Sequence, residues 1–253
     1  MSNLEQLGLY LQFDIQLGLI DATVLENNIL NRIPRLIGCS FYFYSQMYIR
    51  EQTTVPSEEN LQQPLIHFPK DAIISYLDYF PKGKQYGYHL YSLPCRSPHY
   101  DDVSNRFPGG LFEYVRSAVL HDEHPFEHGF FLRICQSFPL LENLTLINNE
   151  PQNRKQLTNE NRDLPVIYYS FLQILRLVNV HDDYIEQFLL NMKTSFQQKI
   201  ALTIKYESLQ RVTENFTRNS MRVNCSKIHV LDLLGKPCVN SLQEYFPNVK
   251  LFQ

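Results

Sequence analysis

The densest group of side chains that could bind a metal is the segment His121-Asp-Glu-His124-Pro-Phe-Glu-His128, with three histidines and three acids. Imidazole and carboxylate groups are common protein ligands of zinc and non-haem iron. The spacing is not the H-E-x-x-H of a helical zinc site, and Pro125 interrupts the helix that would place ligands one turn apart. The segment His181-Asp-Asp183 repeats the start of this pattern without the other ligands. We therefore predict that the acids at both places cap helices, with no metal and no cofactor, and keep a metal-dependent enzyme as an alternative.

Other signals for catalysis are missing from the sequence. It contains no G-x-S-x-G, no G-x-x-x-x-G-K-[ST] and no G-x-G-x-x-G motif. Its five cysteines lie far apart, without a C-x-x-C pair. Cys39 and Cys135 occupy apolar positions of an expected strand and helix, which is typical of buried, unreactive thiols. The sequence therefore predicts a protein that is not an enzyme.

Composition and charge limit the classes of partner. The chain of 253 residues is 44% hydrophobic and 19% charged, as in an ordinary globular protein. Its net charge of -3 gives no reason to expect a nucleic-acid partner. No apolar run approaches the roughly 18 residues that span a bilayer, and residues 1–24 lack the basic and apolar regions of a secretory signal. We expect no membrane association and a cytoplasmic or nuclear location.

A repeated strand pattern, L-x-x-L-x-L, organises the chain. Its first positions fall at residues 115, 141, 172, 199 and 228, which are 26 to 31 residues apart. Looser copies begin at Leu4 and Leu36. Such spacing lies in or just above the range of about 20–29 residues for leucine-rich repeats, in which each repeat contributes one short strand. The pattern predicts successive strands of one parallel sheet, with the leucines directed into the core.

The segments between these strands have the spacing of helices. The residues from Phe126 to Phe138 and from Tyr184 to Met192 each place their apolar side chains on one helical face, and Ala22 to Ile33 do the same. Prolines such as Pro139 then end the helix before the next strand. The sequence therefore predicts an α/β protein that forms a single domain over residues 1–253. Residues 51–106 are an irregular region and residues 148–163 an exposed, mobile insertion.

The segment L141-E-N-L-T-L-I-N-N149 matches the leucine-rich-repeat pattern, with Asn149 in its asparagine position. With its irregular repeat lengths, its helical connections and the phrase FP-x-L-x-x-L-x-L, the chain resembles the leucine-rich region of F-box/leucine-rich-repeat proteins. The resemblance implies a leucine-rich-repeat solenoid, a horseshoe with a parallel sheet on its concave face and helices outside. It also implies a function as the substrate-recognition part of a ubiquitin ligase.

The F-box itself, which binds a Skp-type adaptor in that family, is not found. Residues 1–30 lack its L-P-x-E signature, and the nearest imitation is Phe68-Pro-Lys-Asp-Ala-Ile-Ile-Ser-Tyr-Leu77. Pro81, Gly83 and Gly87 follow this segment where the F-box would continue as a helix. A Skp-type adaptor is therefore an open alternative among the partners.

The positions that alternate with the inward leucines are expected on the concave face, where they would contact a protein partner. Arg176 is flanked by the apolar Ile174 and Val178, which makes it a candidate anchor of binding. We predict a protein–protein interaction module, and the alternative is a leucine-rich-repeat inhibitor or structural scaffold with no ubiquitin link. The candidate partner-binding residues are Ser40, Tyr42, Ser117, Asn143, Thr145, Arg176, Thr203, Lys205 and Asp232.

Overall fold

The computed structural model describes residues 6–14, 27, 30–32, 38–49, 72–153, 164–235 and 242–252. The chain forms two compact units, residues 1–98 and 99–253, whereas the sequence predicts a single domain. The predicted helix from Ala22 to Ile33 lies mostly outside the described residues. So do residues 154–163 of the predicted insertion.

The first unit contains a mixed sheet of four strands in the order β1-β2-β4-β3. Strands β1 and β2 pair in parallel, and β3 and β4 form an antiparallel hairpin whose second strand pairs with β2. The strands are β1 (Gln6–Asp14), β2 (Gly38–Tyr48), β3 (Ile73–Phe80) and β4 (Gln85–Ser92), and a short 3-10 helix, η1, spans Leu30–Arg32.

The two looser copies of the repeat pattern form β1 and β2, but not in the sheet of the other copies. The reason lies in β2, whose side chains from Phe41 to Ser45 are all buried. A strand buried on both faces differs from the half-exposed strand that the repeat pattern implies. Its second neighbour is the antiparallel β4, so a local pattern could not reveal its pairing.

The segment that most resembles an F-box, Phe68–Leu77, forms a strand and not a helix from Ile73 onward. Of the segment Phe68–Leu77, the residues from Ile73 onward belong to β3, and they pair with β4 from Ser92 to Tyr88. The apolar residues of this segment therefore alternate along a strand.

The second unit contains the predicted parallel sheet. Seven strands lie in the order β13-β12-β11-β9-β7-β6-β5, and every neighbouring pair is parallel. They are β5 (His99–Val103), β6 (Ser117–His121), β7 (Asn143–Asn148), β9 (Ile174–Val180), β11 (Ile200–Lys205), β12 (Ile228–Leu234) and β13 (Lys250–Phe252). The α/β class and the parallel sheet are thus confirmed.

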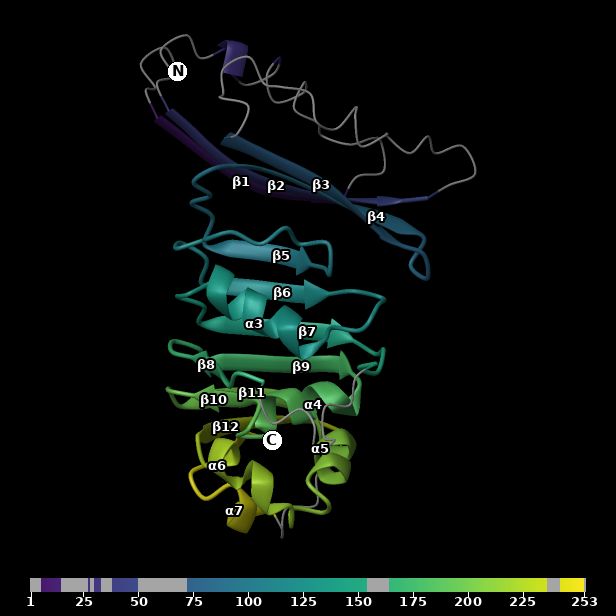
Figure 1. Ribbon diagram of the computed structural model, residues 1–253, viewed down its shortest axis with the longest axis vertical. Coiled ribbons are helices and arrows are strands. Elements are labelled where there is room, and N and C mark those ends of the chain that lie inside the picture. The colour runs from purple at the N-terminus through teal and green to yellow at the C-terminus, as the bar shows by residue number, and fades with distance from the viewer. Residues whose placement is uncertain are drawn as a thin grey trace. The chain divides into compact units, whose positions relative to one another are not determined.

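Helices and two short strands connect the strands of this sheet (Figure 1). Strands β8 (Ile167–Tyr169) and β10 (Thr194–Phe196) pair with each other in parallel and precede β9 and β11. The helical elements are α3 (His128–Ser137), α4 (Asp182–Leu189), α5 (Tyr206–Val212), η3 (Asn219–Met221), α6 (Arg222–Cys225) and α7 (Leu242–Tyr245). None of the helices in the described ranges is long and apolar enough to cross a membrane.

The inward leucines lie in register from strand to strand. Leu144, Leu175 and Leu231 occupy equivalent positions of β7, β9 and β12, and none of the three exposes any surface to solvent. Burial of a leucine side chain contributes about 1.5–3 kcal/mol, so these rows are a main source of stability. The predicted register of the repeats is confirmed at these positions.

Helices α3 and α4 complete the core of this unit. Phe131 and Ile134 of α3 are fully buried, as are Tyr184 and Phe188 of α4. The ring centroids of Phe131 and Phe188 lie 5.3 Å apart in an edge-to-face arrangement, which is a favourable geometry for aromatic pairs. The apolar faces of the two predicted helices are thus buried in the core of this unit, where their aromatic rings meet.

Candidate functional site

The three histidines of the acidic segment 121–128 have separate partners. His121 on β6 lies 3.7 Å from Asp102, and His124 lies 3.2 Å from Asp122. His128 is buried, with its ring nitrogens 3.2 Å from the Gln187 side-chain oxygen and 3.0 Å from the Pro165 carbonyl. Across the described part of the chain, no group of three or more His, Cys, Asp or Glu side chains has the arrangement of a metal site.

The acids of this segment make no capping hydrogen bond at α3, contrary to the prediction. The N-cap of α3 is Glu127, which makes no capping hydrogen bond. Asp122 instead accepts hydrogen bonds from the backbone and side-chain nitrogens of Asn105, at 2.7 and 2.9 Å, and from the His124 backbone at 2.9 Å. It braces the loop between β6 and α3. Asp122 follows β6 directly, whereas the N-cap position of α3 is Glu127.

At α4 the cap is a histidine. His181 is the N-cap, and its Nδ1 accepts a hydrogen bond of 3.2 Å from the Asp183 backbone. Asp182 and Asp183 lie in the first turn, where their charges meet the positive end of the helix dipole. The predicted role of these acids as N-caps is therefore wrong, although their effect on the helix dipole remains.

The described thiols are poor nucleophiles. Burial raises the pKa of Cys39 and of Cys135 from 9.0 to about 11, so both are protonated near neutral pH. Both residues are half-buried, whereas the sequence predicts buried thiols. The Cys135 thiol donates a hydrogen bond of 3.3 Å to the Tyr168 carbonyl.

The buried asparagine of β7 is Asn148, one residue before the predicted Asn149. Asn148 is 2% exposed, and its amide donates a hydrogen bond of 2.8 Å to the His124 carbonyl. Its side-chain oxygen accepts from the Glu150 backbone at 2.9 Å. Asn149 is exposed. The alternation of β7 continues without interruption from Leu144 through Leu146 to Asn148, so Asn148 is the inward residue. The extra residue of the register shift lies on β9, where Leu177 and Val180 pair with Leu146 and Asn148.

The side chains that alternate with the inward leucines lie on one face of the parallel sheet, which we call the outward face. Ser117, Asn143, Thr145 and Thr203 are half-buried, and the charged residues of this face are exposed. The register places one residue of each of five adjacent strands in a line across this face, here called the central row. The central row consists of Val119, Thr145, Arg176, Thr203 and Asp232.

Two of the candidate residues are held by neighbouring side chains. Thr203 donates a hydrogen bond of 3.2 Å to Asp232, and Lys205 donates one of 2.9 Å to Asn179. Asn179 has a left-handed backbone conformation with φ 52°, which asparagine tolerates better than most residues. The sequence reasoning missed Asn179, because its position just after the repeat pattern carries no hydrophobic signal.

Arg176 differs from these residues. It is exposed at the centre of the central row, between Thr145 and Thr203 on the neighbouring strands. Among the residues that the structure describes, it makes no hydrogen bond or ion pair. A guanidinium has five N–H donors in a fixed planar arrangement, so Arg176 presents a complete set of donors to solvent.

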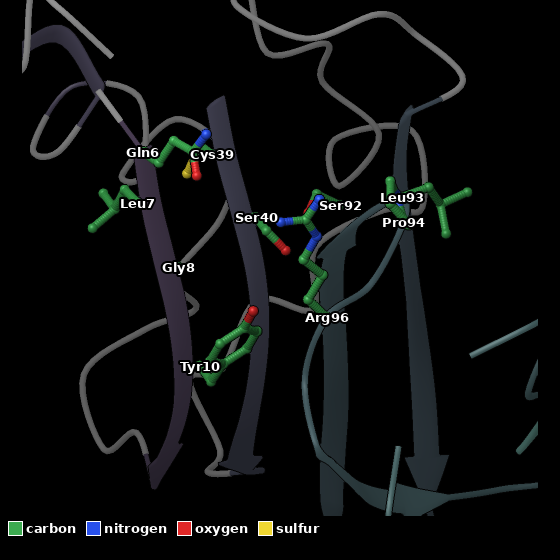
Figure 2. A pocket seen from close by; sticks show the side chains of 10 residues that line it. All are labelled: Gln6, Leu7, Gly8, Tyr10, Cys39, Ser40, Ser92, Leu93, Pro94 and Arg96. Atoms are coloured by element: carbon green, nitrogen blue, oxygen red, sulfur yellow. The ribbon is translucent and has the colours of Figure 1, made fainter. Parts of the chain in front are cut away.

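The remaining two candidates, Ser40 and Tyr42, belong to β2 in the first unit and not to the parallel sheet. Tyr42 is 3% exposed and lies among aromatic side chains, with its ring centroid 6.3 Å from that of Tyr91. Its predicted place on an exposed binding face is therefore wrong. Ser40 is half-buried and lines a pocket of the first unit, with Arg96 (Figure 2).

Comparison of the chain with protein-family models, with curated proteins and with solved structures finds no match.

Proposed function

We propose that residues 99–253 form a leucine-rich-repeat solenoid whose outward face is concave and binds a protein partner. The order of the strands supports the repeat interpretation, because the seven strands of the sheet follow one another in the sequence. The inward leucines in register, with a helix between β6 and β7 and another between β9 and β11, support it as well. Stacked repeats of this kind offer an extended surface for recognition.

The observation that carries the proposal is the position of Arg176. An exposed arginine without an intramolecular partner, in the middle of a row of polar side chains, is suited to pair with a group on another molecule. Arginine is also enriched among the residues that dominate the energy of protein interfaces.

The charges of the central row indicate the chemistry of the partner surface. The partner would place a carboxylate against Arg176 and a hydrogen-bond donor against Asp232, which Thr203 already holds in position. Ile174 and Val178 flank Arg176 along β9 and are half-buried, so a partner that covers them would exclude water from the ion pair. Exclusion of water strengthens such a pair.

A ubiquitin connection has less support than binding itself. The resemblance to F-box/leucine-rich-repeat proteins would make the second unit a substrate-recognition arm. However, the nearest imitation of an F-box forms strand β3 from Ile73 onward. This observation favours the alternative of an inhibitor or scaffold without a ubiquitin link. A cytoplasmic or nuclear location and the lack of enzymatic activity stay predictions.

Proximity labelling with the intact chain tests the proposed function. Cells would express the parent chain, the variant Arg176→Glu and the matched variant Lys199→Glu, which reverses an exposed charge outside the central row. We expect a set of partners that Arg176→Glu loses and Lys199→Glu retains. Equal labelling by all three chains would refute binding at the central row.

Purified components then separate the two forms of the proposal. A Skp-type adaptor that binds the intact chain directly would support the ligase form. Binding of the Arg176-dependent partner without any binding of the adaptor would support the inhibitor or scaffold form.

A further inference from the structure

The first unit contains a pocket that the proposed function does not use. It has a volume of about 280 Å³ and lies between β1, β2 and the segment after β4 (Figure 2). Five of its lining residues carry polar side-chain groups, and the others are mostly apolar. The described lining residues are Gln6, Leu7, Gly8, Tyr10, Cys39, Ser40, Ser92, Leu93, Pro94 and Arg96.

Two serine hydroxyls in the pocket wall can donate hydrogen bonds to a ligand. The Ser40 hydroxyl oxygen is buried and has no hydrogen-bond partner among the described residues. A buried polar group without a partner is costly, so a ligand that accepts a hydrogen bond there would remove an existing penalty. The Ser92 hydroxyl accepts a hydrogen bond of 3.0 Å from the Phe41 backbone, which leaves its own proton available.

The described wall of the pocket carries a positive charge. Arg96 is the single charged residue among the described lining residues, and its guanidinium offers N–H donors. Figure 2 shows its side chain extending toward Ser40 and Ser92. Cys39 adds no negative charge, because burial raises the pKa of its thiol to about 11. The described lining residues include no acidic side chain that would compete for Arg96.

The other walls set the size and the apolar part of a ligand. Leu7, Leu93 and Pro94 supply apolar surface. A Cβ added at Gly8 would lie 3.5 Å from the Tyr10 hydroxyl oxygen, so the Tyr10 side chain runs back along β1 over Gly8. Nine water molecules occupy roughly the 280 Å³ of this pocket in the liquid. A ligand is therefore limited to on the order of ten non-hydrogen atoms.

We propose that this pocket binds a small organic monocarboxylate. Arg96 would pair with the carboxylate, Ser40 and Ser92 would donate hydrogen bonds to it, and the hydrocarbon part would contact Leu7, Leu93 and Pro94. A single guanidinium neutralises one negative charge, whereas a phosphate monoester carries up to two at neutral pH. The balance of charge therefore favours a carboxylate over a phosphate.

Titration of the full chain with butanoate, hexanoate and benzoate, followed by the chemical shifts of backbone amides, tests the proposal. We expect saturable shifts at residues 39–41 and 92–96, with the larger acids binding more tightly than butanoate. Hexanamide has the same hydrocarbon without the charge, and inorganic phosphate has charge without hydrocarbon. Both should bind at least about tenfold more weakly than hexanoate, because a tenfold difference corresponds to the loss of one modest interaction.

Variants of the pocket wall complete the test. Arg96→Gln should weaken hexanoate binding at least about tenfold, and Ser40→Ala should weaken it by a smaller factor without lowering the melting temperature. Arg32→Gln changes an exposed arginine of the same unit that does not line the pocket, so it should bind as the parent does. The proposal is wrong if no acid binds the folded parent at about 10 mM, well above the millimolar range of weak ligands. It is also wrong if Arg96→Gln binds hexanoate as well as Arg32→Gln does.

Discussion

The hydroxyl of Thr203 donates a hydrogen bond of 3.2 Å to the carboxylate of Asp232 on the next strand. The two residues lie directly opposite each other in the parallel register, in the same line of side chains as Arg176. The acid of the central row is thus held by a neighbour, while the arginine two strands away is left for a partner. Because of this difference, Arg176 is the first residue to substitute in a test of binding.

We expect Arg176→Ala to weaken binding of the partner by about 1–3 kcal/mol, within the range of such truncations at interfaces. The side chain is exposed, so the free energy of unfolding should change by less than about 0.5 kcal/mol. Titration of the purified partner and urea denaturation measure the two quantities. Unchanged binding would place the interface elsewhere, and lost stability with intact binding would contradict the outward position of Arg176.

Leu175→Ala should lower the free energy of unfolding by about 2–5 kcal/mol, because the substitution removes buried methyl groups and leaves a cavity. Leu175 exposes no surface and lies between Leu144 and Leu202 in the register. Urea denaturation of the variant and of Thr145→Ala, which changes a half-buried outward residue, provides the comparison. A loss under about 1 kcal/mol at Leu175 would contradict its place in the core.

Asn148 and Asn149 are adjacent residues of the same type, and the structure predicts opposite results for them. Asn148→Ala should cost about 1–3 kcal/mol of stability, because it removes the buried amide that donates to the His124 carbonyl and accepts from the Glu150 backbone. Asn149→Ala should cost less than about 0.5 kcal/mol, since this side chain is exposed. Thermal unfolding of both variants distinguishes them. A larger loss of stability for Asn149→Ala than for Asn148→Ala would indicate that Asn149 is the inward asparagine, as the repeat pattern predicts.

The Cys225 thiol should make stability fall at alkaline pH. Burial raises its pKa from 9.0 to about 12, so above pH 9 the unfolded chain loses the proton that the folded chain retains. The free energy of unfolding therefore decreases as the pH rises from about 9. Cys225→Ala removes this ionisation. Between pH 9 and 11, the free energy of unfolding of the parent should therefore fall more steeply than that of the variant.

Burial also raises the pKa of Tyr184, but this group does not interact with Cys225 and contributes equally to the parent and to the variant. Cys225→Ser, which likewise does not ionise in this range, should show the same change with pH as Cys225→Ala. Parallel stability curves of the parent and both variants would contradict the raised pKa of Cys225.

The repeat pattern alone was enough to predict β6, β7, β9, β11 and β12 and the face that each strand presents to the core. The reason is that the alternation of Leu144 and Leu146 with polar residues is a local property of a strand. The same holds for α4, whose apolar face from Tyr184 to Leu189 recurs with the period of a helix. The order of these elements in the parallel sheet also follows the order of the chain.

Tertiary structure decided what depends on contacts between distant segments. Pairing with the antiparallel β4 separates β2 from the parallel sheet and buries Tyr42, and no local spacing encodes that pairing. The buried Asn148 donates its amide hydrogen bond to the carbonyl of His124, which lies in the loop after β6. The pocket at Ser40 and Arg96 likewise joins residues more than fifty positions apart in the chain. Sequence by itself determined the repeat strands from β6 to β12 and their inward faces, since hydrophobic periodicity is local, whereas the partners of each polar side chain follow from the folded arrangement.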